Sequence, residues 1–321
     1  MLLSSMEVVG GLLLLIWGAD RFVHGAASTA RNLGVKPLLI GMTIVALATS
    51  APEILISAIA SFRGQPDLAI GNAIGSNIVN IGLVLGAVAV IRPIKLTSET
   101  LRSEMPALLA VTLMTVSLFL DGYLSRVDGI VLLTGLVIVM VWLTRLGLQS
   151  TEHDPIAAEY EAEIPRDVTM PRAIFWLLLG LVVLLAGAEL MVNGATEIAR
   201  SMGVTEIVIG IVLVAFATSL PELAVSLVSA FKNEYGLALG NIVGSNLFNM
   251  LAVVGLAAAI QPAALAPSVL SLHVFVMSAF TLVMFAMTYE YGRAGKLGRL
   301  EGTALLTAFV VYDIYVVTQN V

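Results

Sequence analysis

Long apolar stretches separated by short polar breaks follow one another along the whole chain. Each stretch has about 20 residues, and 20 residues of helix rise about 30 Å, the thickness of one hydrocarbon core. A closed barrel would instead show short segments of alternating hydrophobicity, which the sequence lacks. The pattern therefore predicts membrane-spanning helices with breaks at polar or proline-bearing positions. We expect ten of them, at residues 6–30, 37–62, 67–91, 104–120, 126–148, 171–201, 206–231, 236–260, 268–289 and 301–319.

The composition indicates the same class of protein. Of the 321 residues, 59% are hydrophobic and 12% are charged, whereas soluble domains carry about 25% charged residues. The chain has no cysteine and three histidines, which argues against thiolate metal sites, redox chemistry and histidine-based catalysis. The net charge of −6 gives no reason to expect nucleic acid as a partner. We expect no enzyme, no prosthetic group and no obligate protein partner, in a chain surrounded by lipid bilayer.

The sequence contains an internal repeat. Residues 41–86 return as residues 210–255 at a constant offset of 169 positions, with 20 of the 46 positions identical. We infer two structural repeats of five helices, residues 1–149 and 171–321, joined by an acidic linker at 150–170. A five-helix unit starts on one side of the membrane and ends on the other, so the second copy must insert upside down. The expected fold is an all-α polytopic membrane protein whose ten transmembrane helices form two inverted five-helix repeats, with a site at the bilayer midplane.

The basic residues predict the orientation, because lysine and arginine favour cytoplasmic loops. With the N-terminus outside, twelve of them lie in or beside cytoplasmic loops and three in outer loops. No basic segment precedes the first apolar stretch, so we expect the first helix to stay as a span. Both termini are therefore expected outside and the acidic linker in the cytoplasm. The linker is interpreted as a solvated connection, with a weak regulatory cation site as the alternative.

Each copy of the repeat carries a polar motif inside an apolar helix. The first, AxATSAPE, ends at Glu53, and the second, AxATSLPE, ends at Glu222. A carboxylate in lipid costs roughly 2.5–3.5 kcal/mol on insertion scales and by default marks an ion path. Pro52 and Pro221 each remove a backbone N–H and clash with the carbonyl four residues back, so we expect kinks with carbonyls free to bind cations. The oxygens offered are those of Ala46, Thr49, Ser50 and Glu53 in the first copy, and of Ala215, Thr218, Ser219 and Glu222 in the second.

The helix after each motif carries a polar stripe. In the first copy, Asn72, Ser76 and Asn80 recur every four residues and so share one helix face. Carboxylate, hydroxyl, amide and carbonyl oxygens are hard ligands that suit Ca²⁺ or Na⁺ rather than Zn²⁺ or Cu⁺. Gly71 and Gly75 lie beside the stripe, where they allow close backbone approach. The second stripe has Asn241, Ser245 and Asn249, beside Gly240 and Gly244.

The charges of the two glutamates constrain the ligand. Two nearby carboxylates repel each other, and one tends to keep a proton unless cations compensate. One Ca²⁺ or two Na⁺ would neutralise the pair, with protons as a third competitor. The alternative is that these polar residues only join helices, as single Ser, Thr and Asn residues in membranes usually do. Packing alone does not require the same set of groups in both halves, so the duplication favours a cation site.

A second pair of acidic residues is also repeated. Asp20 in the first helix matches Glu189 in the sixth at the same offset. Arg21 follows Asp20 directly, so a local ion pair or a position near the interface is plausible. We expect a structural or gating role for this pair rather than direct cation binding. The tryptophans are expected at interfaces or in packing.

At these motifs the chain resembles a known family. ATSAPE…GNAIGSNIVN and ATSLPE…GNIVGSNLFN are similar to the two α-repeats of the sodium/calcium exchangers, within the cation/calcium antiporter superfamily. The similarity covers nearly the whole chain and is greatest to the compact prokaryotic calcium/sodium antiporters. It implies a secondary antiporter that exchanges Na⁺ for Ca²⁺ by alternating access across a prokaryotic plasma (inner) membrane. The first and sixth helices resemble the long sliding pair of the family.

The resemblance also implies a role for each motif residue. Glu53 and Glu222 would be the central Ca²⁺ ligands, shared with Na⁺. The threonines and the alanine carbonyls would complete Ca²⁺ coordination or shape the flanking Na⁺ sites, and the serines would line those sites. Some relatives have Asp where this chain has Asn249, so we expect no K⁺ requirement. The implied ligands are Glu53, Glu222, Thr49, Thr218, Ser50, Ser219, Ser76, Ser245, Asn80, Asn249 and the carbonyls of Ala46 and Ala215.

Other functions are less favoured by the sequence. A Ca²⁺/H⁺ antiporter on the same scaffold is the nearest alternative, because the two carboxylates could carry protons instead. An intramembrane protease would need a Ser–His or paired-Asp arrangement, which the motif cores lack. A passive channel could use the same cage if it stayed open continuously.

Overall fold

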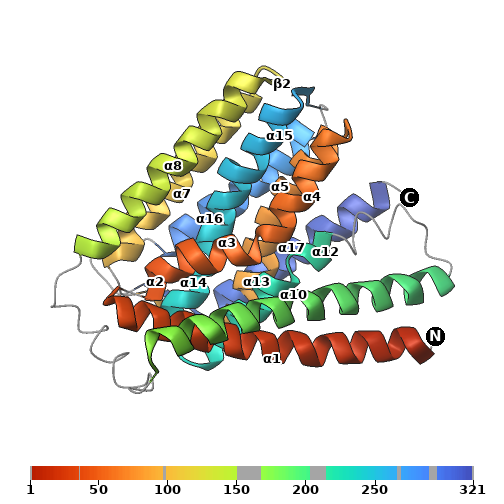
Figure 1. Ribbon diagram of the computed structural model, residues 1–321. Helices are drawn as coiled ribbons and strands as arrows, with labels where there is room; N and C mark the ends of the chain where they lie inside the picture. Colours follow the sequence, from red (N-terminus) through yellow and green to blue (C-terminus); the bar gives the residue numbers. More distant parts are fainter. Residues whose placement is uncertain are drawn as a thin grey trace.

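The part of the chain that the structure describes folds almost entirely into helices, most of which run alongside one another in a bundle (Figure 1). The computed structural model describes residues 2–35, 37–96, 99–149, 168–202, 215–265, 269–288 and 295–319. The helices are α1 (Leu2–Leu33), α2 (Pro37–Ile40), α3 (Ala46–Thr49), α4 (Ala51–Phe62), α5 (Pro66–Val79), α6 (Gly86–Ile91), α7 (Glu99–Phe119), α8 (Arg126–Gln149), α10 (Met170–Ser201), α12 (Ala215–Thr218), α13 (Leu220–Phe231), α14 (Tyr235–Phe248), α15 (Val254–Ile260), α16 (Phe275–Thr288) and α17 (Arg299–Gln319). Four π-helical turns interrupt them among these residues: η1 (Gly41–Val45), η2 (Asn80–Leu85), η4 (Asn249–Val253) and η5 (Val269–Val274).

The described helices include several that are long and apolar enough to cross a membrane. By this criterion six helices qualify, or seven if the bent pair Leu38–Thr49 and Ala51–Phe62 is one span. The prediction of a helical, polytopic membrane protein is therefore confirmed, whereas ten crossings and an inverted arrangement remain predictions. Within α7, the segment Glu104–Phe119 is a shorter apolar helix by the same criterion.

Helices α1 and α10 lie side by side and cross one edge of the bundle at an angle to most of the other helices (Figure 1). They run antiparallel and touch through glycines: a Cβ at Gly18 would lie 2.4 Å from the backbone nitrogen of Leu184. A Cβ at Gly180 would likewise lie 2.3 Å from the backbone nitrogen of Phe22. Small residues permit such backbone contact between membrane helices. This seam of glycines joins the predicted first and sixth helices along much of their length.

Two interrupted helices form the centre of the molecule. In the most apolar window of Tyr235–Ile260, 89% of the residues are buried, and in that of Pro66–Ile91, 72% are buried. The other four single spans have 17–28% of the window buried. The central helices therefore meet protein on nearly all sides, whereas the outer ones present apolar faces to lipid. Their π-helical turns begin at Asn80 and Asn249, two of the predicted site residues.

The predicted kink at the first proline is confirmed. Helix α3 ends at Thr49, α4 starts at Ala51, and the two parts differ in direction by 45°. Pro52 lies in the first turn of α4, where a missing N–H has no helical partner to lose. The second copy has the same order of elements, with a break between α12 and α13. Residues 203–214 lie outside the described residues, and with them the start of the predicted 206–231 helix and of the 210–255 motif.

Two short antiparallel ribbons were not predicted. Strand β1 (Ile94–Leu96) pairs with β4 (Gly295–Leu297), and β2 (Tyr123–Leu124) pairs with β3 (Ala263–Ala264). Strands of two or three residues leave no periodic signal in a sequence, and their partners are more than a hundred residues away. Each ribbon joins the first half of the chain to the second half. Of the predicted linker at 150–170, residues 150–167 lie outside the described part.

Candidate cation site

The two helix breaks carry the predicted polar motifs into the interior. At each break one serine leaves the helical conformation: Ser50 has φ −83° and ψ 5°, and Ser219 has φ −88° and ψ 2°. The next helix then has a proline as its second residue, and its first turn contains Glu53 in α4 and Glu222 in α13. The N-terminal end of a helix stabilises a carboxylate, because its unpaired N–H groups carry partial positive charge. Each break therefore holds a glutamate at a helix N-terminus inside an apolar chain.

The motifs of the two copies contact each other crosswise. Glu53 and Glu222 are each 1% exposed. The hydroxyl of Ser50 in the first motif donates to Oε1 of Glu222 in the second, over 3.1 Å. In the opposite direction, the Thr218 side chain of the second motif lies close to the Glu53 carboxylate. The carboxylates are close enough to repel one another, so a cation between them would relieve both repulsion and desolvation.

Helix α14 supplies further oxygens beside Glu222. The hydroxyl of Ser245 lies 3.4 Å from Glu222 Oε1 and 3.5 Å from the hydroxyl of Thr49. Thr49 donates to Asn241 Oδ1 over 2.9 Å. Asn241 in turn donates to the hydroxyl of Ser226 over 3.1 Å, and all of these side chains are buried. The predicted second stripe therefore meets both motifs.

The stripe of the first copy is less uniform. Ser76 and Asn80 are buried, whereas Asn72 is only partly buried and donates to the hydroxyl of Ser57 over 3.1 Å. No described residue lies within 4 Å of a Cβ built at Gly71 or Gly75. The segment 207–211, which corresponds to the neighbours of the second stripe, is not among the described residues. The expected close approach at these glycines thus stays a prediction.

In the second stripe the close approach is present. A Cβ at Gly240 would lie 2.5 Å from the carbonyl oxygen of Leu38, and one at Gly244 would lie 2.5 Å from that of Met42. Helix α14 therefore packs directly against the backbone of the helix that leads to the first break. This contact brings the second stripe next to Thr49 and explains why only a small residue fits there.

Two asparagines with contacts between the halves were missed by the sequence analysis. Asn77 accepts a hydrogen bond from Asn249 Nδ2 over 3.0 Å, and Asn246 accepts one from Asn80 Nδ2 over 3.5 Å. All four are 1% exposed. The available signal was the triplet GSN, which occurs in both copies. The serine of this triplet falls on the four-residue spacing of the stripe, whereas the asparagine does not and was therefore not predicted.

Several buried side-chain oxygens at these motifs have no hydrogen-bond partner among the described residues. Leaving a buried polar group unpaired costs about 1–3 kcal/mol, and more when it is charged. Such oxygens come from both halves, and a cation bound among them would supply the missing partner. The oxygens are Glu53 Oε2, Glu222 Oε2, Ser76 Oγ, Ser219 Oγ, Asn80 Oδ1 and Asn249 Oδ1.

The expectation that the Ala46 carbonyl loses its helical hydrogen bond was wrong. This carbonyl accepts the N–H of Ser50 over 2.9 Å and lies 3.3 Å from the Thr49 hydroxyl. The N–H that Pro52 lacks would have bonded to the carbonyl of Ala48. The hydrogen bond to the Ala46 carbonyl is therefore not affected by the proline. A carbonyl has two lone pairs, and coordination by Ala46 remains a prediction. Ala215, its counterpart, is the first residue of α12.

The donor set defines the chemistry of the site. In the described ranges no group of three or more His, Cys, Asp or Glu side chains is placed to hold a metal ion. The motifs combine two carboxylates with hydroxyl and amide oxygens. Ligands of this kind suit hard cations such as Ca²⁺ and Na⁺.

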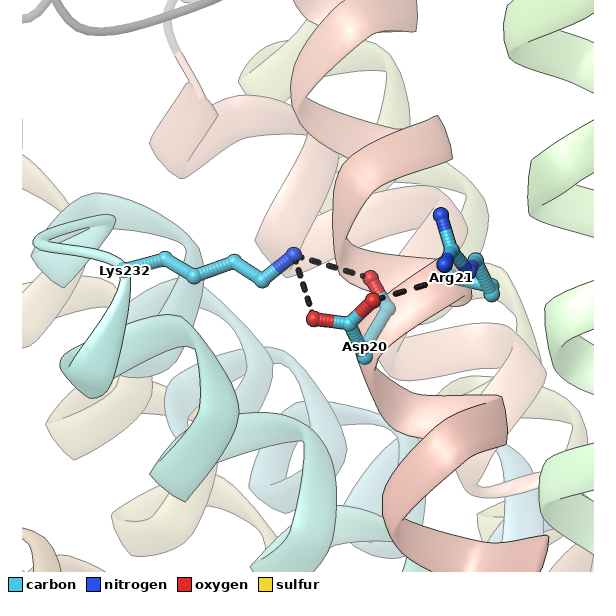
Figure 2. A network of polar contacts seen from close by, with 3 residues as sticks. All are labelled: Asp20, Arg21 and Lys232. Atoms are coloured by element: carbon cyan, nitrogen blue, oxygen red, sulfur yellow. Dashed lines mark hydrogen bonds and ion pairs between the residues drawn. The ribbon is translucent and has the colours of Figure 1, made fainter.

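The repeated acidic residue Asp20 lies away from this site, in an ion-pair network (Figure 2). The predicted local pair with Arg21 is confirmed, at 3.6 Å. The closer partner, which the sequence analysis missed, is Lys232: its Nζ lies 2.8 Å from Asp20 Oδ1 and 3.1 Å from the Asp20 carbonyl oxygen. Arg21 also faces the rings of Trp17 and Trp176, at 5.7 and 5.0 Å from their centroids. Two of the tryptophans thus pack against the Arg21 guanidinium, and packing is one of the roles expected for them.

The fold and the paired motifs define a polytopic helical membrane protein with carboxylate-bearing helix breaks. A family model described as sodium/calcium exchanger protein matches residues 6–145 and 172–318. The chain is 45% identical over 313 residues to CaxA of Alkalimonas amylolytica, named as an antiporter, with 98% of each chain covered. It is 29% identical over 336 residues to the sodium/calcium exchanger MaX1 of Methanosarcina acetivorans, with 94% of this chain and 95% of that one covered. The solved structure of the sodium-calcium exchanger NCX_Mj is similar at a TM-score of 0.84 and 34% identity, over 97% of both chains.

These comparisons place the chain in the class of membrane antiporters. It belongs to the sodium/calcium exchanger protein family. The expected resemblance is therefore confirmed, and cation/calcium antiport is the activity of this class rather than enzymatic catalysis.

Proposed function

We propose that this protein exchanges Na⁺ for Ca²⁺ across the membrane by alternating access, with the ions held near the midplane by oxygen ligands alone. The observation that carries the proposal is the crosswise contact of the two motifs. Ser50 of one reaches Glu222 of the other, and Thr218 of the other reaches Glu53. The names of the similar proteins MaX1 and NCX_Mj support Na⁺ and Ca²⁺ as the exchanged pair.

The charge of the site gives the exchange its mechanism. Two ionised glutamates with no cation repel one another in a buried site, so the empty form resists closing around them. One Ca²⁺, or two Na⁺, cancels the charge and permits the occluded state. Because only an ion-filled site can change sides, movement of one ion type is coupled to movement of the other. We expect a Na⁺ gradient directed inward to drive Ca²⁺ outward.

Each ligand takes a role in this proposal. Glu53 and Glu222 bind Ca²⁺ at the centre and share Na⁺. The threonines and the alanine carbonyls complete the Ca²⁺ shell or border the Na⁺ sites, the serines line those sites, and the two asparagines add amide oxygens. The residues beyond the glutamates are Thr49, Thr218, Ala46, Ala215, Ser50, Ser219, Ser76, Ser245, Asn80 and Asn249.

We infer an inverted arrangement of two five-helix halves, residues 1–149 and 171–321, with the linker 150–170 between them. Matching elements support it: α4 and α13 each have 12 residues, and α5 and α14 each have 14. Five spans per half require opposite insertion. With the basic residues inside, both termini lie outside a prokaryotic plasma membrane and the linker lies in the cytoplasm.

Transport by the purified protein in liposomes tests the proposal. Vesicles loaded with Na⁺ are diluted into Na⁺-free buffer with radioactive Ca²⁺, and we expect Ca²⁺ uptake that stops when an ionophore collapses the Na⁺ gradient. Parallel vesicles carry a proton gradient without Na⁺, or K⁺ in place of Na⁺. Uptake that follows the proton gradient and ignores Na⁺ would replace the proposal by Ca²⁺/H⁺ antiport on the same two carboxylates. Addition of K⁺ is expected to leave uptake unchanged, because position 249 is an uncharged asparagine.

A further inference from the structure

Four buried asparagines form two bonds between the halves of the molecule. Asn77 and Asn80 come from the first half, Asn246 and Asn249 from the second. Asn249 Nδ2 donates to Asn77 Oδ1 over 3.0 Å, and Asn80 Nδ2 donates to Asn246 Oδ1 over 3.5 Å. The two bonds correspond in the repeat: Asn249 matches Asn80 and Asn77 matches Asn246 at the offset of 169 positions. The same relation thus holds on both sides: the later asparagine donates, and the earlier one of the other half accepts.

A backbone carbonyl fixes the direction of the first bond. Asn77 Nδ2 lies 3.5 Å from the main-chain oxygen of Asn246. A carbonyl oxygen can only accept, so the Asn77 carboxamide must turn its NH₂ group toward it. Its Oδ1 is then left for Asn249, which must present its own NH₂ group. The consequence is that Asn249 Oδ1 points elsewhere, where it is buried without a partner in the described part of the chain.

The orientation matters because the two ends of a carboxamide have opposite polarity. An Asn that turned its NH₂ group toward a cation would repel the cation, whereas its oxygen is a good ligand. Asn249 follows Ser245 by one helical turn on the same face, and Ser245 lies 3.4 Å from Glu222 Oε1. Asn80 has the same relation to Ser76, and its Oδ1 is also buried and unpartnered among described residues.

We propose that Asn77 and Asn246 are positioning residues, which hold the carboxamides of Asn249 and Asn80 so that their oxygens and not their NH₂ groups serve the cation. This inference rests on the proposed function. Each of their Oδ1 atoms accepts a hydrogen bond from an asparagine of the other half, and this contact is the one through which they act. Their task is to remove the second orientation of each neighbouring amide before the ion arrives.

Replacing Asn77 tests this role. Asn77→Leu is expected to raise the Ca²⁺ concentration for half-maximal uptake about tenfold, while the maximal rate at saturating Ca²⁺ changes by less than about twofold. Thr112→Ala is the control, since it also removes a buried hydrogen-bonding group, which bonds within its own helix α7 to the Leu108 carbonyl. A purely structural role would lower the amount of folded protein and the maximal rate together and leave the half-maximal concentration unchanged, and that result would overturn the proposal.

A double-mutant cycle separates positioning from folding. Once Asn249→Ala has removed the amide, Asn77→Leu has nothing left to orient, so we expect the double variant to bind Ca²⁺ as weakly as Asn249→Ala alone. Additive losses contradict the inference. If Asn77→Leu does not elute as a single monodisperse species, Asn246→Leu is measured in the same way against Asn80→Ala. Absence of Ca²⁺ transport in the unmutated protein would instead defeat the proposed function.

An independent observation concerns the ion pair in Figure 2. Asp20 lies on α1, and Lys232 follows the last residue of α13, the helix with Glu222 in its first turn. Their 2.8 Å contact therefore ties the helix pair α1 and α10 to an ion-binding helix. Arg21 is held by two tryptophan rings and approaches Asp20 only to 3.6 Å, so Lys232 is the main partner of the carboxylate.

The repeat gives this ion pair a counterpart. The residues that match Asp20 and Lys232 are Glu189 on α10 and Arg63, which follows α4. They have the same charges, yet in the described structure no ion pair joins them. In a transporter with two inverted halves, each half adopts in one state the conformation of the other half in the opposite state. We infer that the two ion pairs alternate: Asp20–Lys232 closes in the state seen here, and Glu189–Arg63 closes when the site faces the other side.

Chemical cross-linking tests this alternation, and the native chain has no cysteine to interfere. One variant carries Asp20→Cys with Lys232→Cys, a second carries Arg63→Cys with Glu189→Cys, and a third carries all four. A cleavable bis-maleimide that spans an ion-pair distance is expected to link either pair and to stop transport until it is cleaved. In the third variant, either link forms but not both in one molecule.

Two outcomes would overturn the alternation. One is accumulation of doubly linked molecules that retain the monodisperse elution of the unlinked protein; the other is transport that continues through a linked pair. Without cross-linking, Asp20→Asn should shift the balance of the two states by about two- to fivefold, the effect of one partly exposed ion pair. The shift is read as the change in side-specific labelling of a single cysteine at Glu189, and an unchanged labelling ratio also contradicts the inference. All these readouts compare variants with an active parent, so they are distinct from a failure of Na⁺/Ca²⁺ exchange itself.

Discussion

Glu53→Gln and Glu222→Gln are each expected to abolish Na⁺-dependent Ca²⁺ uptake. Glutamine keeps the size of the side chain and removes its charge, so the site can no longer neutralise a divalent cation with two carboxylates. Removing the carboxylate from a buried pair of carboxylate and cation costs about 3–5 kcal/mol. At about 1.4 kcal/mol per tenfold change in affinity, Ca²⁺ binding should weaken by about 100-fold or more. Both carboxylates are 1% exposed, so solvent cannot compensate.

The measurement is uptake of radioactive Ca²⁺ by proteoliposomes, with Ca²⁺ titrated against the purified variants in detergent. Glu197→Gln is the matched control, because this glutamate is also on an apolar helix but lies 3.6 Å from Arg200 in an exposed pair. We expect it to transport like the unmutated protein. Normal uptake by either Glu53→Gln or Glu222→Gln would refute the assignment of that residue as a ligand.

Gly11→Ala should destabilise the protein and slow transport, whereas Gly10→Ala should do neither. A Cβ at Gly11 would lie 2.5 Å from the backbone nitrogen of Met191 and 2.8 Å from the carbonyl oxygen of Gly187. Backbone atoms cannot rotate away as a side chain does, so α1 and α10 must separate. Overpacking of this kind costs about 1–3 kcal/mol, which corresponds to a fall in Tm of roughly 2–10 °C.

The neighbouring glycine provides the control within the same turn. At Gly10 the closest atom to a new Cβ is the Leu190 Cδ2 methyl carbon, at 3.9 Å, which is ordinary contact. Alanine is favoured over glycine in a helix by about 0.5–1 kcal/mol, so Gly10→Ala should leave Tm unchanged or raise it. Thermal unfolding of the purified variants measures both. Equal Tm values for the two variants would show that the glycine seam does not depend on backbone contact.

Much of the fold could be predicted from the sequence because the relevant signals are local. The apolar stretches predicted the helices, since a lipid-facing or buried helix needs a continuous run of apolar residues. The kink followed from Pro52 alone. The ribbons β1–β4 and β2–β3 left no such signal, because their pairing is non-local and each strand is too short for periodicity.

The candidate site was predictable where both copies carry the same residue at helical spacing. Glu53 and Glu222 stood out because a carboxylate is rare in an apolar helix. Asn77 and Asn246 were missed because their value comes from partners on the other half, which spacing within one helix does not reveal. The Ala46 carbonyl was wrongly expected to lose its helical hydrogen bond, because the effect of Pro52 was extended two residues beyond Ala48. Lys232 was missed for the same reason as the asparagines, since its partner Asp20 belongs to a distant helix.

The two ribbons also bear on whether the two halves need a continuous polypeptide to assemble. They lie before and after α7, at its opposite ends, and each fastens a strand of the N-terminal half to one of the C-terminal half. Together with the glycine seam, they hold the halves by non-covalent contacts that do not involve the connecting segment. We therefore expect a gene split between residues 150 and 167 to encode two fragments that assemble with each other in the bilayer.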